Sequence, residues 1–405
     1  MSEWKEVRLG SLVRRKIGYG IVQPGASPEK GVPVIKANNI IAGLTSIDEL
    51  DNTTQEIDSK YPRTKLNGGE LIISLVGTVG KTAIVPSSFA GCNLVRATGL
   101  IDIEDPSLTK WVKYYIASSK GQYYINTNLN TTVQATLNVK SLAEMPIPIP
   151  PKREMGKMVD ILSSLDDKIA VNRRICENLE AQAQALFKNW FVDFAPFKNG
   201  KFVESELGMI PEGWRVGRLG EICVFQNGHA FKSKEFSDSG KYKLITIKGV
   251  QDGCLSIDGA VNIENVPSNM KNHCFLKEKD ILLSLTGNVG RVCFVDQPNL
   301  LLNQRVAKIV PISEVYWGFL YTFMRRKTTQ NEMINLAKGT AQANLSPIET
   351  AQFKIALPAQ EVVSDFSKVV NIMYQKMILL KQENLRLATL RDTLLPKLMS
   401  GEIKI

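Results

Sequence analysis

The chain has 405 residues, a formal charge of +10 and a pI near 9.2. Its hydrophobic fraction of 44% and charged fraction of 22% exclude wholesale disorder, and its length predicts two or more domains. The apolar runs at residues 71–76 and 281–285 are too short to span a bilayer, and the charged start MSEWKEVRLG indicates no secretory signal. We therefore expect a cytoplasmic protein, whose modest positive charge weakly favours an anionic partner such as nucleic acid.

The cysteines and histidines indicate neither a disulfide framework nor a metal site. The six cysteines have no CxxC pair and no regular spacing, and the two histidines are His229 and His273. A structural zinc site needs a cluster of such ligands, and reduced thiols are the simpler interpretation in a cytosolic chain. We expect no bound metal.

The first region of the chain, residues 1–151, is expected to be an α+β domain. β-rich runs lie at residues 32–35 and 71–76, and a helical pattern follows at residues 108–118. The region ends in the proline-rich segment MPIPIPP.

The first of two long helices is predicted for residues 152–197. Mostly apolar residues recur at alternating spacings of four and three, which is the a/d heptad pattern of a coiled coil. From residue 152 to about residue 194 the helix would be roughly 60 Å long at ~1.5 Å per residue. Asn172 occupies a seam position, where a polar residue can fix register or orientation. The predicted seam comprises Met158, Leu162, Leu165, Ile169, Asn172, Leu179 and Leu186, with Cys176, Ala183 and Trp190 in the same series.

The second globular region is expected at residues 198–357, with a linker at 198–212. It repeats the pattern of the first, with β-rich runs at 244–247 and 281–285 and a helical pattern at 316–326.

Residues 358–405 predict the second long helix. It should end near Pro396, because proline breaks the helical hydrogen-bond ladder. Asn384 again falls at a seam position. The predicted seam comprises Phe366, Val370, Met373, Met377, Leu380, Asn384, Leu387 and Leu394, with Arg391 in the same series.

The chain is a tandem repeat of a domain and its helix. WKEVRLGSL matches WRVGRLGEI, and LIISLVGTVGK matches ILLSLTGNVGR, both at an offset of 210 residues. TTVQATLN matches GTAQANLS, and this block and the two helix patterns are offset by 208 residues. Several blocks in the same order are not expected by chance and indicate a duplication.

The repeat predicts the architecture. We expect an α+β fold in which two similar α/β domains are separated by two long antiparallel helices forming a coiled coil, with an internal pseudo-two-fold axis. The two globular regions would then lie at opposite ends of a rod. Because duplex DNA has local two-fold axes, such a protein would suit two inverted half-sites with an unread gap. Residues 11–69 and 221–279 align poorly, which favours two readers of different sequences, with neutral drift as the alternative.

The sequence offers no catalytic motif. GTVGKT at residues 77–82 lacks the first glycine of a phosphate loop, because Leu75 stands there, and the second copy reads GNVGRV. A sharp glycine turn is the leading interpretation; contact of Lys81 or Arg291 with a DNA phosphate is the functional one. No GxSxG, HExxH, GxGxxG or amino-methyltransferase tetrapeptide occurs. We expect a chain without catalysis.

Three segments carry a resemblance to a known family. They are LFKNWFVDFAPFKNGKFVESELGMIPEGW at residues 186–214, QNGHAFKSKEF at 226–236 and TLLPKLMSGEI at 393–403, and the join PIPIPPKREM is also typical. With them, nearly the whole chain resembles the specificity (S) subunit of type I restriction–modification systems, which serve bacterial defence. The join after the second globular region, LPAQEVV, is a shorter variant.

The resemblance implies a division of labour between subunits. Two target-recognition domains would each read one half of a split, asymmetric DNA site, and the helices would set the spacing. The chain would dock two modification subunits, which methylate adenine N6, and two restriction subunits, which supply an ATP-dependent nuclease. S-adenosylmethionine, ATP and Mg would bind to these partners, so this chain would need no cofactor.

Candidate DNA contacts follow from the chemistry of base reading, in which Arg and Lys bind guanine and Asn and Gln bind adenine. Polar loops repeated in both halves, with Thr131, Thr132 and Gln134 in one and Thr340 and Gln342 in the other, are candidates for shared backbone contacts. A polar turn is an equally good interpretation of them. For each charged residue, a solvated side chain is the alternative. The candidates are Arg14, Arg15, Lys16, Tyr19, Lys36, Asn38, Asn39, Lys81, Arg96, Thr132 and Gln134 in the first half, and His229, Phe231, Lys232, Lys234, Lys248, Arg291, Arg305, Thr340 and Gln342 in the second.

Two features of the first helix have open interpretations. Phe187, Phe191, Phe194 and Phe197 near its end could cover the second globular region or seat a modification subunit. The Asp pair at residues 166–167 is interpreted as a solvated charge pair.

Two other functions stay in view. A stand-alone enzyme such as a methyltransferase lacks its cofactor motif here. A coiled-coil scaffold that spaces two protein-binding domains would lack the steep salt dependence of DNA affinity that phosphate contacts produce.

Overall fold

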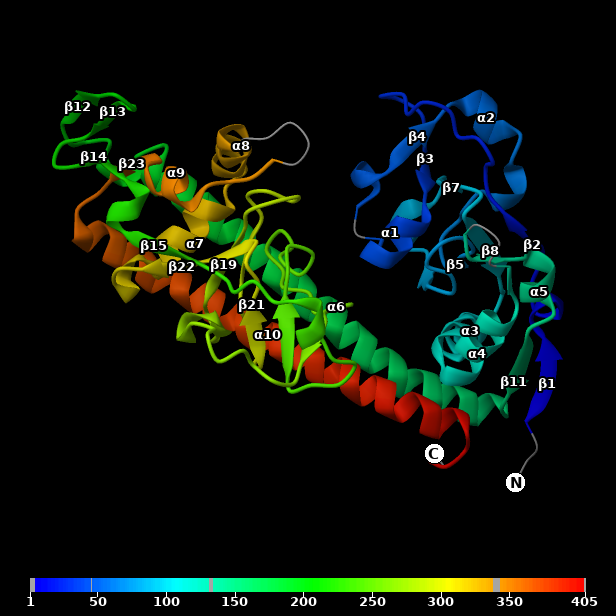
Figure 1. Ribbon diagram of the computed structural model, residues 1–405. Coiled ribbons are helices and arrows are strands. Elements are labelled where there is room, and N and C mark those ends of the chain that lie inside the picture. Colours follow the sequence, from blue (N-terminus) through cyan, green and yellow to red (C-terminus); the bar gives the residue numbers. More distant parts are fainter. Residues whose placement is uncertain (1–3, 45, 131–133, 338–342, 404–405) are drawn as a thin grey trace. The chain divides into compact units, whose positions relative to one another are not determined.

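The chain divides into two compact units (Figure 1). Unit 1 comprises Met1–Lys168 and Leu387–Ile405, and unit 2 comprises Ile169–Arg386. Each contains one globular α/β body and a section of the long helices α6 (Lys152–Phe191) and α10 (Gln360–Met399). The computed structural model describes residues 4–44, 46–130, 134–337 and 343–403. Within these ranges, no helix combines the length and apolar character needed to cross a membrane.

A four-stranded antiparallel sheet forms the centre of unit 1, in the order β2-β8-β5-β6. Leu71 and Ile73 of β5 belong to the core that contains α3 and the long helices, whereas Ile72 belongs to the core on the other face. Side chains alternate along a strand, so β5 is buried on both faces. The strands are β2 (Arg15–Tyr19), β5 (Leu71–Ser74), β6 (Thr82–Ile84) and β8 (Thr98–Asp102).

A second sheet and several helices complete unit 1. In this sheet, ordered β4-β3-β7, β3 pairs antiparallel with β4 and parallel with β7. Asp105 caps α3, because its side chain accepts the Ser107 N–H at 2.8 Å. The remaining elements are β1 (Lys5–Arg8), β3 (Val32–Ile35), α1 (Ala37–Ala42), β4 (Asp51–Thr53), α2 (Gln55–Ser59), β7 (Asn93–Leu94), α3 (Pro106–Ala117), α4 (Ser119–Thr127), β9 (Leu129–Asn130), β10 (Thr136–Leu137), α5 (Val139–Ala143) and β11 (Pro146–Ile149).

Unit 2 has the same plan. Its central sheet runs β15-β22-β19-β20, and its second sheet runs β17-β16-β21-β18. Ile281 and Leu283 of β19 belong to one core and Leu282 to the other, as in β5. The elements are β12 (Phe202–Ser205), β13 (Gly208–Pro211), β14 (Arg215–Arg218), β15 (Cys223–Asn227), β16 (Tyr242–Ile245), β17 (Asn262–Ile263), β18 (Phe275–Leu276), β19 (Ile281–Ser284), β20 (Val292–Phe294), β21 (Leu300–Leu302), β22 (Val306–Pro311), α7 (Trp317–Arg325), α8 (Lys327–Leu336), α9 (Pro347–Ala351) and β23 (Lys354–Leu357).

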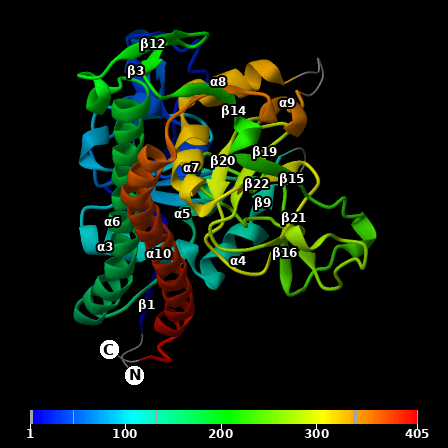
Figure 2. The same cartoon turned by 90° about the vertical axis from the view of Figure 1, so that its left-hand side faces the viewer.

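The helices α6 and α10 lie side by side and run antiparallel (Figures 1 and 2). In unit 2, Asn172 Nδ2 donates to Asn384 Oδ1 at 2.9 Å, and the rings of Phe191 and Phe366 lie 4.9 Å apart. In unit 1, Arg391 Nη1 donates to Asp166 Oδ1 at 2.7 Å. In unit 2 the residue numbers of the contacts rise along one helix as they fall along the other, and the contact in unit 1 continues the same series. The predicted antiparallel pairing and the α+β fold class are therefore confirmed.

The long helices differ from expectation at their ends. α6 ends at Phe191 rather than near residue 194, and Phe194 has a left-handed φ of 52°. α10 continues past Pro396 to Met399. Leu395 and Leu398 are buried in the core of unit 1, so burial of the last turn outweighs the hydrogen bond that proline removes.

The short elements were predicted well. The β-rich runs coincide with β3, β5, β16 and β19, although β16 begins two residues before its predicted start at residue 244. The helical patterns coincide with α3 and α7 to within two residues.

The interpretation of residues 166–167 as a solvated charge pair is wrong for Asp166. Its carboxylate is about one-fifth exposed and pairs with Lys113 at 3.0 Å and with Arg391 at 2.7 Å. Tyr114 donates a third hydrogen bond to it at 2.9 Å. Burial opposes ionisation, but these cations hold the pKa of Asp166 below its usual value. The residue therefore ties α3 and α10 to α6.

Candidate nucleic-acid interface

The two glycine turns that follow the central strands are structural. Gly77 and Gly80 have φ of 78° and 85°, and their counterparts in unit 2 also have positive φ. Such backbone angles favour glycine strongly. Ser74 stabilises the first turn, because its Oγ donates to Thr78 O at 2.6 Å and accepts the Lys81 N–H at 2.9 Å. The turn leaves the Lys81 side chain exposed.

The polar segment before β10 packs on this turn. The Gly77 N–H donates to Ala135 O at 2.9 Å. A side chain at Gly77 would meet Gln134 Nε2 at 3.1 Å, so Gln134 lies directly over the turn. In unit 2 the corresponding pairing joins Thr286 and Asn344. The predicted contacts Thr132, Thr340 and Gln342, together with Thr131, lie outside the described residues.

In unit 1 the structure brings four predicted residues around one hollow of about 460 Å³. Lys36 and Asn38 come from one segment and Arg96 and Gln134 from two others, and all four line the hollow. Its apolar part is formed by Ile21, Val22, Pro24, Ala37, Val76, Val95 and Ala97. We call this set of loops the loop edge of unit 1.

The two cations of the loop edge differ in whether they form an ion pair. Arg96 is exposed, and no ion pair of its guanidinium occurs within the described ranges. Lys36 pairs with Asp51, and both side chains are about half exposed. Asn39 Oδ1 accepts the Lys36 N–H at 2.7 Å, which caps the start of α1. This contact gives the side-chain oxygen of Asn39 a structural role.

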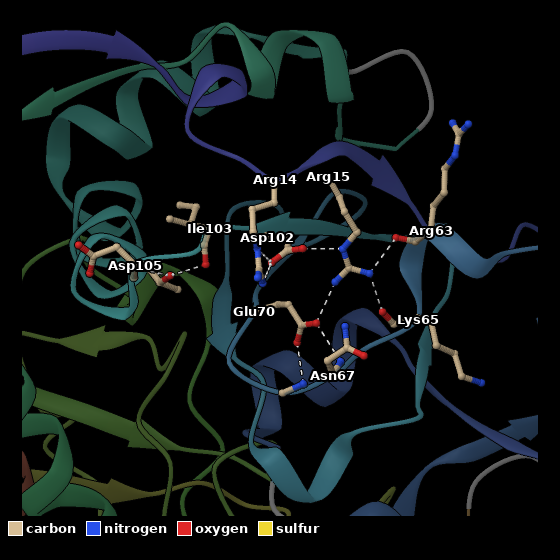
Figure 3. Close-up of polar contacts among 11 residues, drawn as sticks. Arg14, Arg15, Arg63, Lys65, Asn67, Glu70, Asp102, Ile103 and Asp105 are labelled. Carbon is tan, nitrogen blue, oxygen red and sulfur yellow. Dashed lines mark hydrogen bonds and ion pairs between the residues drawn. The ribbon is translucent and has the colours of Figure 1, made fainter.

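Arg14 and Arg15 both pair with buried carboxylates, and the Arg14 side chain stays about half exposed (Figure 3). Asp102 accepts from Arg14 at 2.6 Å and from Arg15 at 2.5 Å, and Arg15 also pairs with Glu70 at 2.9 Å. Arg15 donates further to Lys65 O at 2.8 Å. Burial would raise the pKa of Asp102, but the hydrogen bonds from the two arginines lower it overall. The network uses the donors of Arg15 within the fold, whereas the exposed Arg14 stays a predicted DNA contact.

The other candidates of unit 1 lie outside the hollow. Lys16 and Tyr19 are exposed on β2, and Tyr19 is 51% exposed. Lys81 is on the glycine turn. Neither β2 residue lines the same hollow as Arg96 and Gln134.

In unit 2, three predicted residues gather at a second hollow of about 530 Å³. These are His229, Lys232 and Lys234. The lining also includes five polar residues that the sequence did not single out as DNA contacts: Asn227, Glu235, Asn269, Lys271 and His273. The missed residues lie in residues 221–279, which match nothing in the first half, so the repeat could not point to them. Positive charge was an available signal for Lys271 alone.

The remaining candidates of unit 2 lie elsewhere. Lys248 and Arg305 are exposed, and Arg291 Nη1 donates to Gln251 Oε1 at 2.7 Å. Phe231 packs edge-to-face on His229, with ring centroids 4.9 Å apart, and adjoins the core beneath. Its contacts are those of a packing residue.

The loop that includes Gln251 is tied to the long helices of unit 2. Arg325 of α7 pairs with Asp252 in this loop and, at 3.2 Å, with Glu180 of α6. Lys381 of α10 donates to Gly253 O at 2.9 Å. Burial counts against the charged form of Arg325, but its acidic neighbours raise its pKa overall. Arg325 therefore fixes the loop that presents Gln251 to Arg291.

The phenylalanines at the end of α6 cover unit 2. Phe187 and Phe191 are buried, and their rings lie 5.3 Å and 5.0 Å from the ring of Phe319. Phe194 and Phe197 pack on Trp214 at 5.4 Å and 5.2 Å. These contacts support the interpretation in which the rings cover the second globular region.

The predicted seam of the helix pair is largely enclosed. Its buried members are Met158, Leu162, Ile169, Asn172, Phe366, Val370, Met377 and Leu380, and its half-buried members are Leu165, Leu179, Leu186, Met373, Asn384, Leu387 and Leu394. Among the described residues, no group of three or more His, Cys, Asp or Glu side chains could hold a metal ion.

Two α/β units of one topology are joined by long antiparallel helices and differ in the residues that line their hollows, which defines a duplicated two-unit protein. The family model described as type I restriction modification DNA specificity domain matches residues 1–181 and 211–387. The chain therefore belongs to the type I restriction modification DNA specificity family.

Individual relatives agree with this assignment. The type I restriction enzyme MjaIX specificity subunit of Methanocaldococcus jannaschii is 29% identical over 310 residues, which cover 75% of this chain and 71% of the relative. The HindI specificity subunit of Haemophilus influenzae is 27% identical over 473 residues and covers 100% of each chain. The crystal structure of a type I restriction–modification S subunit from M. genitalium is 16% identical, with a TM-score of 0.51 over 98% of this chain and 96% of that one. This last likeness is one of fold.

Proposed function

We propose that this chain is the DNA-recognition subunit of a cytoplasmic type I restriction–modification complex. Each unit reads one half of a split, asymmetric target, and α6 and α10 set the spacing between the halves. The observation that carries the proposal is the loop edge of unit 1, where separate segments bring together side chains suited to base reading: Lys36, Asn38, Arg96 and Gln134.

The chemistry of the loop edge suits a major groove. Arginine reads guanine with two hydrogen bonds, and the amides of asparagine and glutamine read adenine in the same way. Apolar side chains such as Val22 and Val76 beside them suit the methyl group of thymine. In unit 2, the exposed candidates Lys248 and Arg305 lie on the segment after β16 and the segment before β22, which are the counterparts of the segments that carry Asn38 and Arg96. Different side chains on corresponding segments support a different half-site sequence.

The helices supply a surface for partner subunits. Ile372 and Leu379 of α10 are 73% and 52% exposed and lie seven residues apart, hence on one face of the helix. We assign this face to the docking of two modification subunits, with two restriction subunits completing the complex. S-adenosylmethionine, ATP and Mg bind to those partners, and this chain contributes specificity without catalysis.

The methylome of cells that express this chain with the genes beside it tests the proposal. N6-methyladenine should appear at one split, asymmetric motif when the gene is present and vanish when it is deleted. Methylation that persists unchanged without the gene, beside an active methyltransferase, would contradict the proposal. Absence of salt-dependent DNA binding by the reconstituted complex would then favour the protein-binding scaffold.

Gln134→Ala tests the loop edge. The change should weaken binding of the first half-site by ~1–3 kcal/mol, because one base-reading amide is lost. Gln55→Ala, an exposed change on α2, serves as the matched control and should leave binding unaltered. Equal binding of the natural target by both variants would reject the role of Gln134.

A further inference from the structure

The hollow of unit 2 differs in chemistry from that of unit 1. Three lysines line it, namely Lys232, Lys234 and Lys271, and all three are exposed. No ion pair of their ammonium groups occurs within the described residues, whereas Lys36 in unit 1 is paired with Asp51. The lining of this hollow is therefore strongly cationic and available to an anion.

The carboxylate in the wall is held away from the lysine ammonium groups. Among the described lining residues, Glu235 is the one acidic side chain. Its Oε2 accepts the backbone N–H of Lys232 at 2.7 Å, which closes the short helical turn Ser233–Glu235. Glu235 thus stabilises the backbone turn that carries the lysines. The lining contains three lysines and one carboxylate, so its net charge is positive.

His273 adds an oriented ring to the same wall. Its Nε2 lies 2.8 Å from Asn227 O. A carbonyl oxygen can only accept, so Nε2 carries the proton and the ring orientation is fixed. Nδ1 then remains as the second polar atom of the ring, and on protonation it becomes a donor.

The hollow is joined rigidly to the strands of unit 2. The His229 N–H donates to Leu302 O at 2.9 Å, and the Gln304 N–H donates to His229 O at 2.9 Å. The residue after Gln304 is the exposed candidate Arg305. The cationic wall is therefore fixed beside the loop that precedes β22, where unit 2 presents side chains to a half-site.

We propose that this hollow binds a backbone phosphate of the DNA duplex beside the half-site of unit 2. Lysine ammonium groups act as compact point charges that suit phosphate oxygens and carry little base specificity. The assignment rests on the proposed function and deepens it. Lys232, Lys234 and Lys271, with His273, grip DNA regardless of its sequence, and base reading in this unit falls to other side chains.

Lys271→Gln in the full-length chain tests the assignment, with the exposed Lys201→Gln as the matched control. Binding is measured for a duplex with the natural target and for one without it, over a series of salt concentrations. Lys271→Gln should weaken both complexes by the same factor, about five- to tenfold at ~0.1 M salt, and should reduce the slope of log affinity against log salt by about 0.9. Lys201→Gln should change neither. An unchanged salt slope, or a loss confined to the target duplex, would overturn the assignment.

Methylphosphonate substitution, which neutralises single phosphates in the target duplex, locates the contact. The wild-type chain should lose affinity when one phosphate beside the second half-site is neutralised, and Lys271→Gln should lose less at that position, because one of the lysines that contact this phosphate is already absent. Equal sensitivity of the two proteins at every phosphate would overturn the inference. If the wild-type chain showed no salt-dependent DNA binding at all, the proposed function itself would be contradicted. If the wild type bound DNA normally and Lys271→Gln bound it equally well, only the assignment of the phosphate site would be contradicted.

Discussion

The two units share a backbone plan and differ in how they neutralise the carboxylate that precedes the central strand. In unit 1, Glu70 pairs with Arg15 of β2 at 2.9 Å; in unit 2, Asp280 pairs with Lys308 of β22 at 2.8 Å. Both carboxylates also accept backbone N–H groups from the turn before them. The anion thus has the same place in both units, and the cation comes from different strands.

A second polar contact is also made by different side chains in the two units. Tyr114 of α3 donates to Asp166 of α6 at 2.9 Å. At the offset of 208 residues, Thr322 and Tyr374 lie 2.8 Å apart, hydroxyl to hydroxyl. A charged hydrogen bond in one unit is neutral in the other, although it joins equivalent helices. Each unit can therefore alter its polar contacts while the common backbone stays in place.

The largest expected effect comes from breaking the ion-pair network of unit 1. Asp102→Ala leaves Arg14 and Arg15 without their shared carboxylate and should destabilise unit 1 by about 3–5 kcal/mol. At the offset of 208 residues, unit 2 has Val310, so Asp102 has no counterpart there. Chemical denaturation of the full chain should show one transition moving and the other staying. Asp51→Ala, which breaks the exposed pair with Lys36, is the control and should cost about 1 kcal/mol or less.

The same carboxylate predicts a pH dependence confined to unit 1. Because the pKa of Asp102 is lowered in the folded state, its contribution is present above the unfolded pKa and is lost as pH falls through the folded pKa. The difference in stability between wild type and Asp102→Ala should therefore shrink on acidification below about pH 4. A difference that stays constant down to pH 2 would show that the charge of Asp102 does not stabilise the fold.

The next largest effect is expected from the ion pairs of Arg325, which hold the loop at residues 251–253 of unit 2 in place. Arg325→Met removes the cation between Glu180 and Asp252 and should cost unit 2 about 2–3 kcal/mol. Arg325→Lys keeps the charge and should recover part of this loss. If the loop positions Gln251 and Arg291 for DNA, Arg325→Met will also weaken the second half-site and leave the first unchanged. Equal weakening of both half-sites would refute such a local role.

The sequence allowed the fold to be predicted further than the site. Alternating apolar residues and the heptad pattern located β5, β19 and the long helices, because burial of a strand face or a helix stripe leaves a periodic signal. Ion-pair partners such as Arg15 and Asp102 are 87 residues apart and leave no local signal. Arg15 was consequently predicted as a DNA contact, although its donors are used within the fold.

The candidate site could be predicted only in part, because contacts between distant segments leave no local signal in the sequence. Arg96 and Gln134 were chosen for their chemistry, and the structure places them at one hollow because β8 and β10 bring distant segments together. Lys271 and His273 could not be found by comparing the halves, since their segment has no match in unit 1. Topology, rather than composition, decides which cations converge.

A smaller effect, similar in both units, is expected from the glycine turns. Gly80→Ala and Gly290→Ala each force a side chain into positive φ and should cost about 1–2 kcal/mol. Gly80→Ala should cost slightly more, because its Cβ would lie 3.0 Å from Ile125 Cδ1. Gly156→Ala in α6, where a Cβ meets nothing within 4 Å, is the opposite control and should stabilise by about 0.5–1 kcal/mol. Thermal denaturation measures all three; a neutral Gly80→Ala would show that the turn can change its backbone.

The smallest effect on stability is expected at the polar layer of the helix pair. Asn172 Nδ2 donates to Asn384 Oδ1 at 2.9 Å and to Glu383 Oε2 at 2.8 Å, whereas Asn172 Oδ1 is buried without a hydrogen bond among the described residues. At the offset of 208 residues, these asparagines correspond to Leu380 and Cys176, so the layer departs from the repeat. Asn172→Leu combined with Asn384→Leu should leave stability unchanged or raise it by up to ~1 kcal/mol, since polar seam residues cost stability.

In the double variant, the two helices should no longer be restricted to one register. A buried polar pair specifies alignment because slippage would separate its hydrogen-bonding groups, whereas leucine packs almost as well one turn away. If α6 and α10 set the gap in the DNA target, the variant should methylate sites with shorter or longer gaps that the wild type ignores. Val171→Leu, on an exposed position of α6, controls for added bulk. Retention of one gap length at unchanged stability would mean that apolar packing alone fixes the register, and that the asparagines are a remnant of divergence between the two halves.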